Sequence, residues 1–180
     1  MIYYDPSRTN PPSNLSYEDL ASNDFKNKIA IRSSSNIYNQ SLIASLIYHN
    51  GESKTKKWLK GFVSNSSRKP QGNDRAQVMA VAYGEAELAI VNHYYLGIML
   101  SGKSGEKQKS AAEKVSVAFP NANNRGVHVN ISGAGIIKYS KNTKNAVRFL
   151  EYLISDEAQK INAEKNLEYP IKQNLIVTDF

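Results

Sequence analysis

The sequence predicts an α/β fold built on a largely parallel or mixed sheet. Short apolar stretches with strand character alternate with longer stretches whose apolar residues recur at helical spacing. Polar residues that favour helix starts follow several of the apolar stretches directly, which is typical of a strand that leads into a helix. In such folds, ligands bind at the carboxyl ends of strands and the amino ends of helices.

The first part of the chain supplies two strands and two long helices. Residues 2–4 predict a strand, and a connector rich in Pro, Asn and Ser leads to a capped turn at 16–20. A second strand at 28–32 ends in a serine run that caps a helix over 37–50. A further helix is expected over 54–63, because its apolar residues share one face.

The later elements follow from the same patterns of apolar spacing and capping. They are, in order, a helix over 74–83 capped by Asn73 or Asp74, a strand at 88–91, a helix from the following tyrosines to Ser101, a strand at 115–119, one or two strands within 127–138, and helices over 146–154 and 155–166.

Composition excludes several classes of function. The net charge of +7 and the pI of about 9.4 raise the question of nucleic-acid binding, but the lysines are scattered, and basic and aromatic residues do not interleave on any predicted strand. Cysteine is absent, so no thiolate site or disulfide exists. Nucleophile-elbow, phosphate-loop and dinucleotide-binding motifs are missing, which argues against an enzyme. No apolar run is long enough to span a membrane.

The adjacent pair Tyr94-Tyr95 is the strongest indication of chemistry. It stands where the strand at 88–91 ends and a helix is expected to begin. Phenolate oxygens are hard, anionic donors, which suit hard and highly charged metal ions. A helix start also favours anionic oxygen through its free N–H groups and partial positive charge. The pair therefore points to capture of a trivalent ion such as Fe(III).

Other polar clusters leave two interpretations open. The run at 33–36 suits an anion held by backbone N–H groups, although a simple helix cap explains it as well. The stretch at 72–75 suits a polar handle for a ligand, or only a turn and a cap. The three histidines form no HExxH pattern or close pair, so a zinc site is not indicated.

Several segments together resemble the ferric-iron-binding proteins of bacterial ABC importers. The resemblance runs in order along nearly the whole chain and includes segments with the sequences RSSSNIYNQS (32–41), GNDRAQ (72–77), AIVNHYYLG (89–97), VNISGAG (129–135), FLEYL (149–153) and EYP (168–170).

The resemblance implies a type II periplasmic-binding-protein-like fold, with two lobes that close on one Fe(III). Residues 1–130 would form the second, ligand-binding lobe, with a mixed sheet flanked by helices. Residues 131–180 would return to the first lobe and pack their helices on it. In the tyrosine-rich branch of the family, the iron ligands would be Tyr38, Tyr94 and Tyr95.

A related branch of that family holds an anion beside the iron. The resemblance therefore suggests anion-binding or supporting roles, left open here, for Ser34, Ser35 and Asn92, and the polar stretch at 72–75 adds Asn73 and Arg75 as candidates.

The resemblance further implies a periplasmic location and an inner-membrane permease as partner. Most of the first lobe has no counterpart in the chain, and no signal peptide is recognisable, so we expect a truncated form that binds iron loosely. An apolar stripe on the helix over 146–154 would then lack its cover, which predicts self-association. The alternative function is a lobe for another small ligand or oxyanion, contacted by the same tyrosines without iron.

Overall fold

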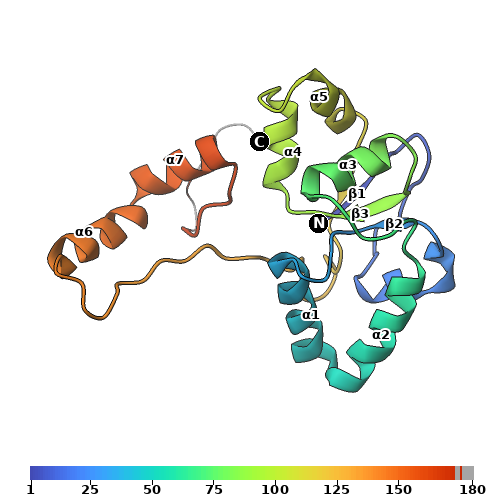
Figure 1. The fold of residues 1–180 in the computed structure, drawn as a ribbon, viewed down its shortest axis with the longest axis horizontal. Helices are drawn as coiled ribbons and strands as arrows, with labels where there is room; N and C mark the ends of the chain where they lie inside the picture. The colour runs from blue at the N-terminus through green and yellow to red at the C-terminus, as the bar shows by residue number, and fades with distance from the viewer. Residues whose placement is uncertain (173–174, 176–180) are drawn as a thin grey trace. The chain divides into compact units, whose positions relative to one another are not determined.

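The computed structural model describes residues 1–172 and 175 (Figure 1). The chain divides into two compact units, Met1–Asn130 and Ile131–Phe180. The last part of the predicted 131–180 segment, at 173–174 and 176–180, lies outside the described residues.

The first unit contains a mixed four-stranded sheet with the order β2-β3-β1-β4. Strand β1 (Ile2–Tyr4) pairs antiparallel with both β3 (Leu88–Ile90) and β4 (Ser116–Ala118). Strand β2 (Ile29–Ala30) pairs parallel with β3. The mixed sheet agrees with the prediction, and the carboxyl ends of the parallel strands β2 and β3 lie at one edge, as α/β folds require of a ligand site.

Helices cover both faces of this sheet (Figure 1). They are η1 (Glu18–Ala21), η2 (Asn23–Phe25), α1 (Ile37–Asn50), α2 (Glu52–Ser64), α3 (Asp74–Ala82), α4 (Tyr94–Leu100) and α5 (Glu106–Ala112).

Alternation along the strands divides the core into two layers. Ile2 and Leu88 face a cluster built on α1 and α2, which includes Trp58. Tyr3 and Ala89, their next neighbours in the chain, face the opposite cluster built on α3, α4 and α5. Because successive side chains of a strand point to opposite faces, one short sheet holds both helical layers and fixes the start of α1 and of α4 relative to it.

Gly61 allows α2 to approach the turn η1 closely. A Cβ atom at this position would meet the carbonyl oxygen of Ala21 at 2.6 Å. We expect Gly61→Ala to lower the free energy of unfolding by about 1–3 kcal/mol, because the clash outweighs the better helix propensity of alanine. Urea unfolding measures this change. The exposed neighbour Lys60 provides the control, since Lys60→Ala should change stability by less than about 0.5 kcal/mol. A higher unfolding midpoint for Gly61→Ala would contradict the packing argument.

The second unit contains α6 (Thr143–Leu153) and α7 (Asp156–Asn166). The hydroxyl of Ser155 caps α7 by accepting a hydrogen bond from the Ala158 N–H at 3.3 Å. Apolar side chains of this unit stay exposed, among them Phe149 at 59% and Ile154 at 54%. Self-association through this face therefore stays a prediction. No helix in the described part of the chain is both long and apolar enough to cross a bilayer.

The prediction of one or two strands within 127–138 is wrong for the part of the chain that the structure describes. These residues form no strand, and Val129 and Ile131 are largely exposed. A β-strand is defined by its hydrogen-bonded neighbour, and no described strand pairs with this segment. Its apolar residues suggested a strand because pairing is invisible in local sequence.

Candidate metal centre

The three tyrosines lie at the starts of two helices. Tyr38 is the second residue of α1, and Tyr94 and Tyr95 are the first two residues of α4. The side chain of Asn36 caps α1, accepting hydrogen bonds from the backbone N–H groups of Tyr38 at 3.2 Å and Asn39 at 3.4 Å. This cap fixes the backbone that carries Tyr38, as expected for an asparagine at a helix start.

The phenol groups gather although they come from distant parts of the chain. The Tyr94 hydroxyl donates a hydrogen bond to the Tyr38 hydroxyl at 3.0 Å. The rings of Tyr94 and Tyr95 lie 4.4 Å apart between centroids, tilted by 35°. Tyr95 also interacts with both of the other phenols. Phenol oxygens that gather in this way can bind one small cation, provided that they lose their protons.

The protein alone holds these phenols in their neutral form. Burial, followed by the hydrogen bonds to Tyr38 and Tyr95, raises the pKa of Tyr94 well above the ordinary value near 10. Burial also raises the pKa of Tyr95, aided by the negative charge of Asp74, while a hydrogen bond with Tyr94 opposes the shift. Deprotonation at neutral pH therefore needs a strong positive charge brought in by the ligand.

A buried ion pair adjoins the tyrosines. The side chain of Asp74 is only 3% exposed and pairs with the guanidinium of Arg32. The same guanidinium lies 6.0 Å from the ring centre of Tyr38. Sequence reasoning treated Asp74 as a helix cap and missed this pair. Because Asp74 is already paired with Arg32, the phenols are the remaining source of negative charge for a cation.

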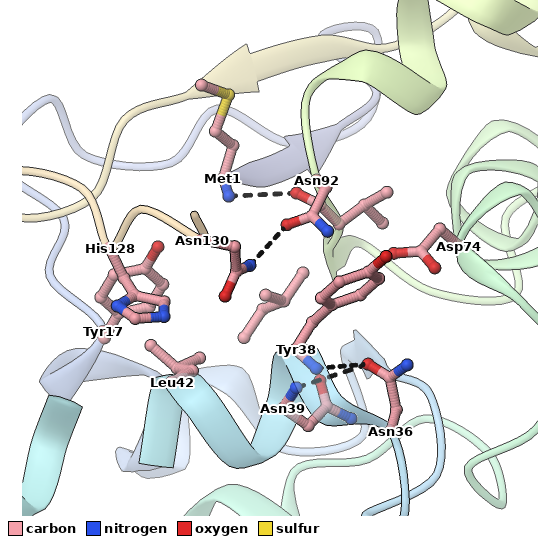
Figure 2. Close-up of a pocket in the computed structure, with 12 residues that line it drawn as sticks. Met1, Tyr17, Asn36, Tyr38, Asn39, Leu42, Asp74, Asn92, His128 and Asn130 are labelled. Atoms are coloured by element: carbon pink, nitrogen blue, oxygen red, sulfur yellow. Dashed lines mark hydrogen bonds between the residues drawn. The ribbon is translucent and has the colours of Figure 1, made fainter. Parts of the chain in front are cut away.

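A small pocket lies beside Tyr38 in the first unit (Figure 2). Its volume is about 20 Å³, roughly the room that one water molecule occupies. The residues that line it include Tyr38, Asp74, Asn92, His128 and Asn130. Tyr94 and Tyr95 are not among them, and a pocket of this volume has no space for a sizeable organic ligand.

The predicted supporting residues lie in different surroundings. Asn92 lines the pocket. Ser34 and Ser35 are exposed ahead of α1, where Ser35 bonds to Ser33. Asn73 caps α3 by accepting from the Ala76 N–H at 3.0 Å, and Arg75 donates to Ser104 at 3.1 Å. Only the first of these five predicted residues lines the pocket beside Tyr38.

Two residues in the pocket were not singled out from the sequence. The Nε2 of His128 lies 2.9 Å from the Ser41 hydroxyl on α1. Asn130 donates to the side chain of Asn92 at 3.0 Å. The sequence patterns at 127–138 indicated a strand and a family resemblance, but not a site role for either residue. Among the described residues, no three His, Asp or Glu side chains group to hold a metal ion, so phenols are the principal candidate donors.

Comparison with known proteins places this site in context. Residues 1–179 match the family model described as bacterial extracellular solute-binding protein. The chain is 48% identical over 171 residues to iron uptake protein A1 of Synechocystis, which covers 95% of this chain and 47% of that protein.

Solved structures resemble the chain as well. A Trichodesmium protein solved in complex with iron and citrate is 49% identical, with a TM-score of 0.94, over 99% of this chain and 56% of that one. A ferric binding protein from Campylobacter jejuni is 37% identical, with a TM-score of 0.92, over 99% of this chain and 57% of that one. The chain thus spans about half the length of these relatives.

Proposed function

This chain belongs to the bacterial extracellular solute-binding protein family, and we propose that it captures ferric iron through the phenolate oxygens of Tyr38, Tyr94 and Tyr95. The family is one of solute-binding proteins rather than enzymes. The observation that carries the proposal is the convergence of phenols from α1 and α4, with 3.0 Å between the Tyr38 and Tyr94 oxygens. Relatives named for iron uptake or solved with iron support the same cargo.

Charge balance explains why the cargo would be Fe(III). Three phenolates supply three negative charges, which balance the three positive charges of Fe(III). Because Arg32 already neutralises Asp74, no further carboxylate of the described site adds to this total. A divalent ion would lower the tyrosine pKa values less and leave an excess negative charge in a half-buried site, so it should bind more weakly.

The biological setting follows from the family. We infer that the loaded protein delivers iron to the membrane permease of an ABC importer and works in the periplasm or outside the cell. The support is the extracellular solute-binding family together with the iron-uptake relatives. Since the chain spans about half of those relatives, this delivery role is proposed for the protein whose lobe it forms.

Titration of the 180-residue chain with ferric citrate tests the proposal. Phenolates bound to Fe(III) should produce a visible charge-transfer band that saturates at one iron per chain. Zinc and magnesium citrate, as controls, should neither produce the band nor prevent it. Saturable binding of phosphate or carbonate without iron, and no band with ferric citrate, would instead support a lobe for an oxyanion.

A further inference from the structure

The side-chain amide of Asn92 is held in one orientation by its oxygen, while its NH₂ group makes no hydrogen bond of normal geometry in the described structure. The Asn130 Nδ2 donates to the Asn92 Oδ1 at 3.0 Å (Figure 2). The Asn92 Nδ2 is fully buried, and no acceptor in the described structure meets hydrogen-bonding geometry with it. Buried donors are nearly always paired in native proteins, so this donor calls for an acceptor.

The Tyr94 oxygen is a suitable acceptor, and it lies 3.0 Å from the oxygen of Tyr38, which lines the same pocket as Asn92. Figure 2 shows the Asn92 nitrogen turned away from Asn130, on the side of the pocket where Tyr38 lies. The interaction of Asn92 with Tyr94 lowers the pKa of that tyrosine, although burial and the bond to Tyr38 raise it overall. A neutral phenol is a modest acceptor, whereas a phenolate accepts a shorter and stronger hydrogen bond.

Asn130 is itself held in place from the other side. The His128 Nε2 lies 2.9 Å from the Ser41 hydroxyl of α1, which anchors the imidazole. Burial lowers the pKa of His128, and a hydrogen bond with Asn130 opposes that shift. A hydrogen bond that favours the charged form of a histidine is one that the ring N–H donates, so the Asn130 oxygen is the acceptor here. The Asn130 nitrogen is then available to donate to Asn92.

We propose that Asn130 is a positioning residue that locks the amide of Asn92 so that its N–H donates to the Tyr94 oxygen once this oxygen is a metal-bound phenolate. The inference rests on the proposed capture of ferric iron. In the iron-loaded protein, the Asn92 Nδ2 donates a charge-assisted hydrogen bond to the phenolate. The lock prevents the amide from turning its oxygen toward the phenolate, which would repel it.

The Asn130→Asp variant reverses this arrangement with almost no change in shape. A carboxylate only accepts, so the Asn92 amide should rotate, give its NH₂ group to the new carboxylate and face Tyr94 with its oxygen. We expect the affinity for Fe(III), measured by competition with citrate, to fall about tenfold to a hundredfold. The phenolate-to-iron band should move to longer wavelength, because a phenolate without its donor is the better electron donor.

Two further variants separate charge and folding from orientation. Asn36→Asp adds the same charge to the same pocket, and aspartate caps a helix as well as asparagine does. It should not reproduce the loss, since a negative charge favours a cation. Asn130→Ala removes the lock without adding charge and should shift the band in the same direction with a smaller loss of affinity. It serves as the test if Asn130→Asp does not fold.

The outcomes are distinct when the titrations are run with and without bicarbonate and phosphate. Affinity and a band like those of the unmodified chain, in both Asn130 variants, would overturn the positioning role. A loss that occurs only with added bicarbonate or phosphate would overturn it as well, by assigning the Asn92 amide to an anion. An unmodified chain without any iron band would remove the proposed function itself, before any variant is compared.

Discussion

Replacing Tyr94 with phenylalanine should weaken the visible iron band per bound iron and weaken Fe(III) binding by more than about a hundredfold. Loss of a group that only supports a metal ligand lowers metal affinity by about 10- to 100-fold. Loss of a ligand itself should lower the affinity by more than this. Tyr94 is the central phenol of the three, since it donates to Tyr38 and its ring lies 4.4 Å from that of Tyr95 between centroids. Its removal takes away one of three negative charges, so the two remaining phenolates no longer balance the charge of Fe(III).

A matched substitution elsewhere in the first unit controls for the loss of any phenol. Tyr48 lies on α1 with 85% of its surface exposed, so Tyr48→Phe should leave the iron titration unchanged. Thermal unfolding of both variants without iron checks that the fold is retained. If Tyr94→Phe binds iron with the colour and affinity of the unmodified chain, the ligand set is wrong, even if the protein still binds iron by other groups.

Local pattern was sufficient for most of the fold. The strands at 2–4 and 88–91 were predictable because short apolar stretches are bounded there by polar turns. Helix α5 was missed because its buried face consists of alanines such as Ala111 and Ala112, which give no apolar periodicity. The expected strands within 127–138 were wrong for a different reason, since pairing between strands is not a local property. The predicted α/β fold and the family resemblance are both confirmed by the solved relatives.

The candidate site was only partly accessible to sequence reasoning. The pair Tyr94-Tyr95 signals a hard metal ion by chemistry alone, because two adjacent phenols at a helix start have few other uses. Tyr38 entered only through the family resemblance, and its bond to Tyr94 spans 56 positions of the chain. The pairing of Arg32 with Asp74 spans 42 positions. Each of these polar residues looks like an ordinary cap or surface group until the fold brings it beside the tyrosines.

Iron binding should depend steeply on pH, with the affinity for free Fe(III) rising as pH rises. In the iron-free protein, the raised pKa values of Tyr94 and Tyr95 keep both phenols protonated throughout pH 5–8. The loaded site needs phenolates, so the iron-free state holds more protons and acid favours release of the metal. If all three tyrosines bind, three protons leave per iron, and the affinity should change by about a thousandfold per pH unit.

Proton release measured directly distinguishes this account from one with fewer phenolates. Ferric citrate is added to the weakly buffered chain at pH 7, and the base needed to hold the pH is compared with that for the same addition to buffer alone, after correction for the protons that citrate takes back when it gives up the ion. We expect about three protons per iron bound for the unmodified chain and about two for Tyr38→Phe where it still loads. A release of one proton or none would mean that the oxygens gathered by α1 and α4 remain phenols. The ion would then be held by other groups, because neutral phenols cannot balance a trivalent charge.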